Sequence, residues 1–476
     1  MSINQALHNA FSGLTAQSRR AELVARNVAN ASVDGYAARE ARLTERLAGP
    51  KASGVRAELP TRAGDPAVTA SRRRVEADAG RLADEAANLK KLSELTGPNG
   101  PAGALAERYA VFETALRSLA DRPESPLLQE SAVEAASGLA KSFNAISNEA
   151  TRHRNATDGE VRRQVNELNR ALKEIASLNR EIRSATAQGV DATGLEDERD
   201  RQIDVVNGIV PIRAQKTEHG GMDVRAPDGT LLAGTYAAEL TPPAADGAIA
   251  LNGPSGNVLL ADAGAADRTT LDGGTLEAAR GFAAQADGFA AELDALAIRL
   301  AARFEGVAGA TPAGEGLFTF DADPTDVGAA PAPADAAARL KLNERLAGAG
   351  VGLIQQGLDL VAPATRGPAD ATAPRALLEA FMRPLDASGG GDPSGRDAFA
   401  EATAFASDRE ALARRAETDA AARRGAVEGL REAELAKSGV DTDAQLAELM
   451  AIEKAYAANA RVLQVADEML ARLVEM

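Results

Sequence analysis

The sequence predicts a mainly α-helical protein with a terminal coiled-coil helix pair, a nested helical-bundle domain and a small inserted β domain. The first observation is composition: aromatic residues make up 3% of the 476 residues and tryptophan is absent, which favours helical bundles built from small side-chain contacts. The second is a helical spacing of apolar residues over most of the chain. The third is a change near residue 209 to short apolar segments flanked by turn residues, which is typical of strands.

Residues 3–28 are expected to form the first terminal helix. Apolar residues recur there at alternating spacings of four and three, the pattern of a helix that packs lengthwise against another helix. The positions in this stripe are Ile3, Leu7, Ala10, Leu14, Gln17, Ala21, Val24 and Val28. Ser2 and Gln5 match a capping box at the start of this helix.

The residues after the first helix indicate a turn motif. Asparagine and Asp-Gly pairs end helices because they tolerate left-handed backbone and offer side-chain hydrogen bonds. The motif residues are Asn27, Asn30, Gly35 and Tyr36. Residues 50–66 are rich in proline and glycine and predict an extended linker.

Helical periodicity returns at about residue 66 and continues to about residue 200. Apolar stripes cover residues 105–119, 128–146 and 161–182. The breaks between them are short, so neighbouring helices should be antiparallel. These breaks are placed at Gly97-Pro98, Pro123 and Gly159.

Two charged runs lie in this helical stretch. Arg72, Arg73 and Arg74 are interpreted as a solvated helix face, the usual environment of such a run. Residues 195–200 carry five consecutive charged residues, for which a helix cap or a salt-bridge cluster is a better interpretation than a catalytic site.

Strand signals occupy residues 209–274, where short apolar segments alternate with Gly, Pro and Asp. Asp228-Gly229 is a candidate hairpin turn within them. Helix resumes at about residue 274, a loop-rich stretch covers residues 306–395, and a long helix is expected from about 397 to 435.

The last helix repeats the pattern of the first. Its stripe consists of Leu449, Ile452, Tyr456, Asn459, Leu463, Ala466, Leu470 and Leu473. Thr442 and Gln445 match a second capping box. Residues 1–46 carry six basic and four acidic residues, whereas residues 437–476 carry four basic and seven acidic residues. These opposite net charges favour pairing of the two helices, although single exposed pairs contribute little.

The stripes and breaks predict three domains. A terminal helical assembly domain comprises residues 1–46 and 436–476, a helical-bundle domain comprises 47–208 and 275–435, and a β-rich domain is inserted at 209–274. The predicted assembly interface consists of Ile3, Leu7, Leu14, Val24, Val28, Leu449, Ile452, Tyr456, Leu463, Leu470 and Leu473.

The last helix also carries apolar residues outside its stripe, at Val462, Val465, Met469 and Met476. Two paired helices cannot cover a third apolar face, so neighbouring subunits are expected to cover it. Pairing of the two helices within a single chain is the alternative interpretation.

Composition and motifs argue against several other functions. A net charge of −16 opposes binding to nucleic acid or to an anionic membrane surface. With no cysteine, disulfides and thiolate metal sites are excluded. There is no apolar run of 18 residues for a membrane span and no cleavable secretory signal.

Candidate catalytic and ligand sites are weak, so no enzyme activity and no cofactor are expected. The three histidines, His8, His153 and His219, lie in different predicted segments. The aspartates within residues 321–326 do not have the spacing of a calcium-binding EF-hand loop. Residues 389–391 are three glycines without the Gly-Lys-Ser/Thr that completes a phosphate-binding loop.

Both ends of the chain resemble the flagellar axial protein family, which contains rod, hook and hook-filament junction proteins. The N-terminal resemblance rests on Asn27–Asn30 and Asp34–Tyr36. The C-terminal resemblance rests on Ser438–Asp441, Ala455–Val462 and Asp467–Leu470. The family usually has Thr-Pro-Gly-Tyr where this chain has Val33–Tyr36, and Asn-Leu-Asp-Glu-Glu where it has Asp441–Gln445.

The middle of the chain is similar to one branch of that family. Residues 112–123, 139–144 and 195–200 look like the helical domain of the hook-associated protein 1 family, and Gly316–Phe320 fits the segment after its long central helix. Rod and hook proteins, the alternative, would be β-rich where residues 66–200 are helical here. A helical enzyme or coiled-coil adaptor is a weaker alternative. The chain is short for the family.

The resemblance implies an extracellular structural subunit of the bacterial flagellum at the hook-filament junction. Such subunits are exported unfolded by the flagellar type III apparatus and form a ring of copies through their terminal helices. The partners implied are the flagellar hook protein, the second hook-filament junction protein (FlgL) and a cytoplasmic export chaperone (FlgN).

Overall fold

The computed structural model describes residues 3–33, 35–48, 51–241, 249–253, 256–261, 273–305, 307, 316–320, 335–356, 367–385 and 395–475. The chain forms two compact units. Unit 1 contains residues 1–81, 162–277 and 422–476, and unit 2 contains residues 82–161 and 278–421. This division differs from the three domains expected from the sequence, because four of the helices contribute residues to both units.

The predicted mainly helical fold is confirmed. The helices are α1 (Ile3–Asn30), α2 (Pro66–Glu94), α3 (Leu105–Asp121), α4 (Pro126–Ala187), α5 (Thr193–Ile209), α6 (Gly274–Arg303), α7 (Ala336–Arg339), α8 (Leu353–Gln356), α9 (Thr372–Met382), α10 (Ala398–Ser438) and α11 (Thr442–Glu475). The strands are β1 (Arg39–Glu40), β2 (Leu43–Ala48), β3 (Lys51–Ala57), β4 (Thr61–Arg62), β5 (Arg213–Lys216), β6 (Met222–Arg225), β7 (Leu231–Ala233), β8 (Glu239–Leu240), β9 (Ile249–Gly253), β10 (Gly256–Ala261), β11 (Phe318–Phe320) and β12 (Leu340–Leu342).

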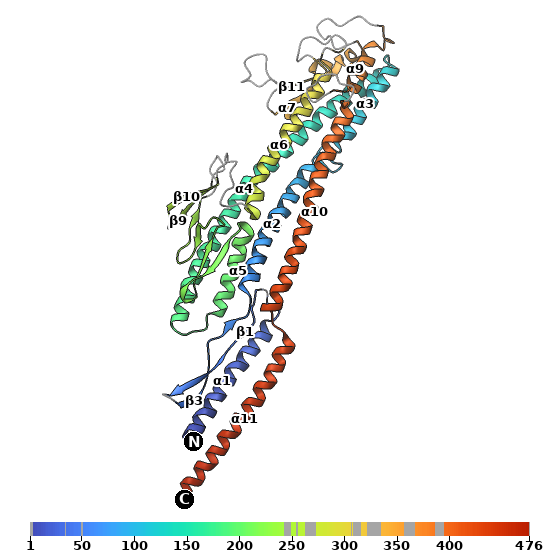
Figure 1. The fold of residues 1–476 in the computed structure, drawn as a ribbon. Helices are drawn as coiled ribbons and strands as arrows, with labels where there is room; N and C mark the ends of the chain where they lie inside the picture. The colour runs from blue at the N-terminus through green and yellow to red at the C-terminus, as the bar shows by residue number, and fades with distance from the viewer. Residues whose placement is uncertain are drawn as a thin grey trace. The chain divides into compact units, whose positions relative to one another are not determined.

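In unit 1 the two terminal helices, α1 and α11, lie side by side (Figure 1). The β2–β3 hairpin packs against α1, and the Ser12 hydroxyl accepts a hydrogen bond of 3.1 Å from the Val55 amide. The linker predicted for residues 50–66 is therefore wrong in part. The alternation around Val55 forms strand β3, and the short strand β4 pairs with β1.

Two antiparallel three-stranded sheets, with strand orders β5-β6-β7 and β10-β9-β8, pack in unit 1. Asparagine side chains of α4 contact both sheets. Their amide groups form hydrogen bonds with the strand backbone, as the backbone of a neighbouring strand would do. Asn169 exchanges two 2.8 Å hydrogen bonds with the backbone of Leu240, and Asn179 bonds both backbone groups of Met222. The predicted turn at Asp228-Gly229 is confirmed, with Gly229 at φ +97°.

The predicted break at Gly159 is wrong, because α4 continues without interruption from residue 126 to residue 187. One glycine inside a helix costs about 1 kcal/mol relative to alanine. The fully buried Val165 and Leu168 that follow it offset this cost through the apolar area that they remove from water.

An aromatic cluster forms the centre of unit 2. Phe112 of α3 lies with its ring 5.9 Å from Phe304 and Phe318 and 5.6 Å from Phe381, measured between centroids. Phe381 belongs to α9, a helix that falls in the stretch expected to be loop-rich. The sequence does not predict α9, because proline at position 374 suggests a break in helical structure. Proline is tolerated there because Pro374 lies in the first turn, where the backbone amide has no partner within any helix.

Replacing Phe112 with alanine should reduce the free energy of unfolding by about 3–5 kcal/mol, because a fully buried ring that contacts three others is removed. Urea unfolding followed by circular dichroism measures this loss. The neighbouring Val111→Ala is the control, since Val111 is 48% exposed. Equal losses in the two variants would contradict the assignment of the aromatic cluster as the core.

Candidate assembly interface

The terminal helices run antiparallel and are in close contact. Arg20 of α1 forms a 2.7 Å ion pair with Glu448 of α11, which is one place where the opposite charges of the two ends meet. Nearer the N-terminus, a Cβ atom on Gly13 would lie 2.8 Å from the Asn459 side-chain nitrogen. Glycine at position 13 therefore allows the two backbones to approach closely.

The predicted pairing of the terminal helices is confirmed. The contact face of α11 follows the predicted stripe in part, because Leu449 and Tyr456 of that stripe are exposed. We define the α11 seam as the residues of α11 that are buried or half-buried in the described structure. They are Gln445, Glu448, Ile452, Ala455, Asn459, Ala460, Leu463, Ala466 and Leu470. Spacings of three and four alternate along most of the seam, and positions 445, 452, 459 and 466 repeat every seven residues.

The residues predicted for the assembly interface fall into three groups. Val24 and Ile452 are buried between the helices, and Leu7, Leu14, Leu463 and Leu470 are half-buried. Val28, Leu449 and Tyr456 are exposed in the single chain. The side chains of Ile3 and Leu473 lie outside the described residues. The assignment of these residues to contacts between subunits remains a prediction.

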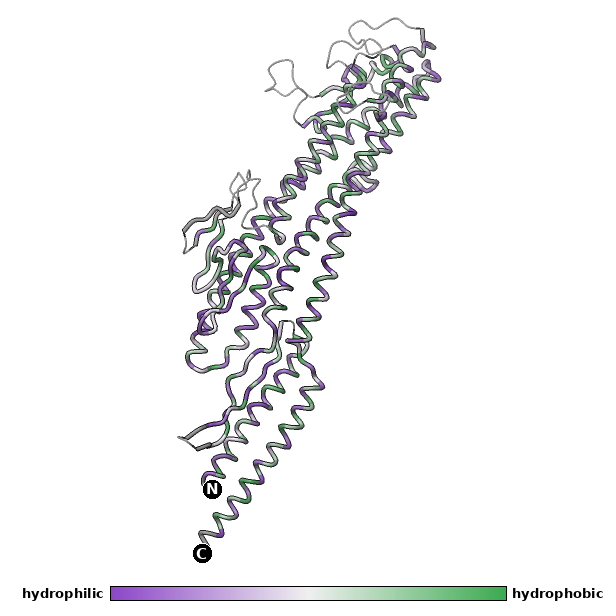
Figure 2. Tube along the Cα trace, in the orientation of Figure 1, coloured by the Kyte–Doolittle hydropathy of each residue, from purple (hydrophilic) through white to green (hydrophobic). Residues whose placement is uncertain are grey.

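Exposed apolar residues flank the α11 seam on both sides. Leu446, Leu449 and Tyr456 each follow a seam residue by one position. Val462, Val465 and Met469 each precede a seam residue by one position. Because successive residues of a helix are about 100° apart, the first three lie on one side of the seam and the last three on the other. Hydrophobic residues recur along the whole of α11 (Figure 2).

Helix α1 carries a similar exposed face that sequence reasoning missed. Phe11 is 67% exposed, and it lies between the half-buried Leu7 and Leu14 at spacings of four and three. Periodicity does not reveal Phe11, because the positions displaced by one from the predicted stripe are mostly polar, as at His8, Thr15 and Glu22.

Asn27 joins the end of α1 to the start of α11. Its Oδ1 accepts hydrogen bonds from the Tyr36 hydroxyl (2.8 Å) and the Arg39 amide (3.0 Å). Its Nδ2 donates to the Arg39 carbonyl (3.0 Å) and to the Gln445 side chain (2.9 Å). The side chain is 1% exposed, and these four bonds use its full hydrogen-bonding capacity.

The other members of the predicted turn motif have separate roles. Burial raises the pKa of the Tyr36 hydroxyl, which therefore remains a hydrogen-bond donor to Asn27. Gly35 adopts φ +75°, and a Cβ there would lie 3.1 Å from the Arg201 side chain. Asn30 is not part of this cluster and donates to the Arg26 carbonyl at 2.8 Å.

The capping box predicted at Thr442 and Gln445 is wrong. The Asp441 carboxylate caps α11 by accepting hydrogen bonds from the amides of Asp443 (3.0 Å) and Ala444 (3.1 Å). Gln445 instead accepts from Asn27. Aspartate competes well for this position because its charge also complements the helix dipole. In the first predicted box, Ser2 lies outside the described residues.

An arginine–aspartate network connects α5 to the segment that follows α1. Arg39 pairs with Asp197 at 2.9 Å, and Arg62 pairs with Asp197 at 2.7 Å and with Asp200 at 2.6 Å. Asp197 is 4% exposed. The charged run at residues 195–200 is therefore a salt-bridge cluster, as its sequence indicates.

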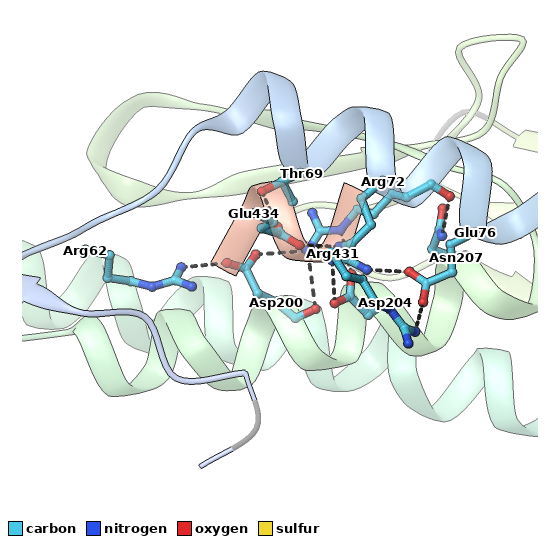
Figure 3. Close-up of polar contacts among 10 residues, drawn as sticks. Arg62, Thr69, Arg72, Glu76, Asp200, Asp204, Asn207, Arg431 and Glu434 are labelled. Atoms are coloured by element: carbon cyan, nitrogen blue, oxygen red, sulfur yellow. Dashed lines mark hydrogen bonds and ion pairs between the residues drawn. The ribbon is translucent and has the colours of Figure 1, made fainter. Parts of the chain in front are cut away.

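The interpretation of Arg72 and Arg73 as a solvated face is wrong, because they are 8% and 7% exposed. Arg73 donates to Asp204 at 2.6 Å, and Arg72 pairs with Asp204 at 2.9 Å as well as with Glu76 (Figure 3). Buried arginines are stable when carboxylates neutralise them. Asp204 lies about 130 residues further along the chain, so the local run does not reveal it.

The described residues contain no group of three His, Asp or Glu side chains close enough to hold a metal ion. Within the same ranges, no helix is both long and apolar enough to cross a membrane. The aspartates of 321–326 and the glycines of 389–391 lie outside the described residues.

Comparison with known families matches three regions of the chain. The family described as "Flagellar hook-associated protein FlgK helical domain" matches residues 89–311. The C-terminal family of flagellar basal body rod FlgEFG proteins matches residues 432–476, and the flagella basal body rod protein family matches residues 7–36. The middle of the chain is therefore similar to the flagellar hook-associated protein FlgK family, and its two ends are similar to flagellar basal body rod proteins.

Curated relatives in the FlgK family cover about half of this chain. Flagellar hook-associated protein 1 of Bacillus subtilis is 25% identical over 237 residues, which are 47% of this chain and 46% of the relative. The protein of the same name from Escherichia coli is 24% identical over 49% of this chain and 44% of its own length. The chain thus spans less than half the length of the curated relatives that it matches. The flagellar hook junction protein FlgK from Burkholderia pseudomallei aligns with a TM-score of 0.43 and 21% identity, over 53% of this chain and 47% of that one.

Substituting leucine for Gly13 should weaken the helix pair by about 1–3 kcal/mol, because the added side chain collides with Asn459. Hydrogen exchange of the α11 amides measures this loss. Asn459→Ala removes the colliding group, so the double variant should recover part of the protection. Ser18→Leu, at an exposed site of α1, is the control. Loss of protection in the control, or no rescue, would contradict this contact.

Acid should destabilise the arginine–aspartate network. Burial opposes ionisation of Asp200, but the charges of Arg62 and Arg73 outweigh it and hold the pKa of this carboxyl below its ordinary value. The stabilisation is therefore present above the ordinary aspartate pKa of about 4 and is lost as pH falls through the lower folded value.

Urea unfolding at several pH values tests this dependence on Asp200. Asp200→Asn should be less stable than the parent at neutral pH, and the difference should shrink as pH falls. The exposed Asp121→Asn is the matched control. A difference between Asp200→Asn and the parent that stays constant with pH would exclude a contribution from Asp200 ionisation.

Proposed function

We propose that this chain is a structural subunit of the bacterial flagellum at the hook-filament junction, outside the cell, and that it assembles through its terminal helices. It acts as a building block and not as an enzyme. The observation that carries the proposal is the exposed apolar surface beside the α11 seam. Leu446, Met450 and Val465 are each more than half exposed, although α11 already buries a full face against α1.

An apolar surface of this kind favours contact between subunits. The α11 seam is satisfied within the chain by Ile452 and Ala466, so the flanking residues are free to contact other molecules. On α1, Phe11 provides a large exposed ring of the type enriched in the buried centres of protein interfaces. Removing these residues from water would stabilise an assembly by about 25 cal/mol for each Å² of apolar surface.

The family relationships support the hook-filament junction over other positions in the flagellum. The ends match families of basal body rod proteins, so a rod or hook position is the second candidate. The middle favours the junction, because residues 89–311 match the FlgK helical domain and form long helices where a rod or hook protein would be β-rich.

The proposed position at the hook-filament junction indicates which proteins the chain would contact. The chain would form a ring of its own copies, contact the hook protein on one side, and contact the second junction protein (FlgL) on the other. Before export, a chaperone (FlgN) would bind the C-terminal region, where α11 offers apolar residues such as Met450 and Met469. The similarity to the FlgK family and the exposed faces of α11 support these partners.

Val465→Asp should block assembly and leave the isolated chain folded. Val465 is 51% exposed in the single chain, so a charge there costs little before assembly but several kcal/mol in a dry contact between subunits. Electron microscopy of filaments in a strain that produces only this variant measures assembly, and thermal unfolding of the purified chain measures its stability.

Gln464→Asp is the matched control, because Gln464 is the preceding residue and is also exposed. Ile452→Asp separates the two roles of α11: this residue is 3% exposed, so its replacement should weaken the helix pair within the chain. Normal filaments with Val465→Asp would contradict the proposed assembly surface.

A further inference from the structure

The C-terminal part of α10 is held within unit 1 with little apolar burial. Between residues 422 and 438, all of which are described, Val427 is the one buried side chain, and Leu430, Glu434 and Ser438 are half-buried. Leu435 is 64% exposed. The hydrophobic effect scales with the apolar area removed from water, so it contributes little to the attachment of this segment.

Ion pairs with α2 take the place of apolar contacts. Arg423 pairs with Asp78 at 2.6 Å. Arg431 pairs with Glu76, and Glu434 pairs with Arg72 (Figure 3). The Thr69 hydroxyl also donates a hydrogen bond to Glu434. We call these contacts the α2–α10 latch.

The neighbouring contacts of unit 1 also contain ion pairs, but neutral and apolar contacts reinforce them. Between α2 and α5, Arg72 and Arg73 pair with Asp204. The buried amide of Asn207 also donates to the Arg73 carbonyl at 2.7 Å, and α5 buries Ile203 and Val206 completely. Between α1 and α11, the Arg20–Glu448 pair is accompanied by the buried Ile452 and by the neutral hydrogen bond from Asn27 to Gln445. Salt affects neutral and apolar contacts far less than it affects exposed ion pairs.

We propose that the α2–α10 latch is a conformational device that opens reversibly with ionic strength. In the open state, residues 422–438 separate from α2, while α11 remains paired with α1 and α5 remains packed on α2. The side chains of Arg423 and Arg431 are 45% and 51% exposed, so dissolved ions reach them. The screening length falls from about 10 Å at 0.1 M salt to about 3 Å at 1 M.

Hydrogen exchange of the full chain at 0.1 M and 1 M sodium chloride tests this device. Amides within residues 422–438 should exchange roughly tenfold faster at 1 M, as expected when the two partly exposed pairs of Arg423 and Arg431 are screened together. Amides of residues 165–182 and 452–466 should change little, and return to 0.1 M should restore protection. Equal exchange of residues 422–438 at both concentrations, or equal acceleration everywhere, would overturn the proposal.

A charge swap provides the matched variants. Asp78→Arg alone places an arginine beside both Arg423 and Arg81, with which Asp78 pairs, and should open the latch already at 0.1 M. The double variant Asp78→Arg with Arg423→Asp should restore protection and its dependence on salt. Replacing both residues with leucine should keep the latch closed at both concentrations, since apolar contact is not screened. Loss of salt dependence in the charge-swapped variant would also overturn the proposal.

Glu410→Gln is the control for general charge effects. It removes an exposed pair with Arg414 on the same helix, outside the latch, and should leave exchange of residues 422–438 unchanged. These measurements use the isolated chain, so they do not depend on the proposed function in the flagellum. A failure of the latch and a failure of that function are therefore distinguishable.

Discussion

Packing of α1 along α11 is the contact on which the rest of the structure depends. It brings the two ends of the sequence together, with Gly13 close to Asn459 and Asn27 bonded to Gln445. Because the two helices are antiparallel, the chain leaves the pair after α1 and has to return before α11. All the elements between α1 and α11 therefore belong to a chain segment that starts and ends at this helix pair. This explains why both units are assembled from segments distant in sequence.

The two units are stabilised by different interactions. Unit 2 has an aromatic centre around Phe112, where burial and ring contacts dominate. In unit 1, polar groups connect the elements: Asn27 joins α1 to α11, Asn179 joins α4 to a sheet, and Asp197 joins α5 to the strands after α1. Such contacts are directional, so they fix the geometry of unit 1 more strictly than apolar packing alone would.

The sequence predicts what depends on local pattern and misses what depends on distant partners. Helix periodicity places both terminal helices, and Asp228-Gly229 places a turn, because neighbouring residues encode these features. Arg72 and Arg73 look solvated because Asp204, which neutralises them, is brought close only by folding. On α11 the predicted stripe and the observed contacts agree at Ile452 and again from Asn459 to Leu470. They differ at Leu449 and Tyr456, where the preceding residue of the helix makes the contact instead.

The exposed apolar residues of α11 change from one side of the α11 seam to the other along the helix. Near its start, Leu446 and Tyr456 lie on one side of the seam, and near its end Val462 and Met469 lie on the opposite side. One helix can thus bridge two different molecules at two heights along its length. In the proposed assembly, such an offset, non-reciprocal contact would yield a staggered array in place of a closed dimer, since each copy would present one type of surface to the copy before it and another to the copy after it.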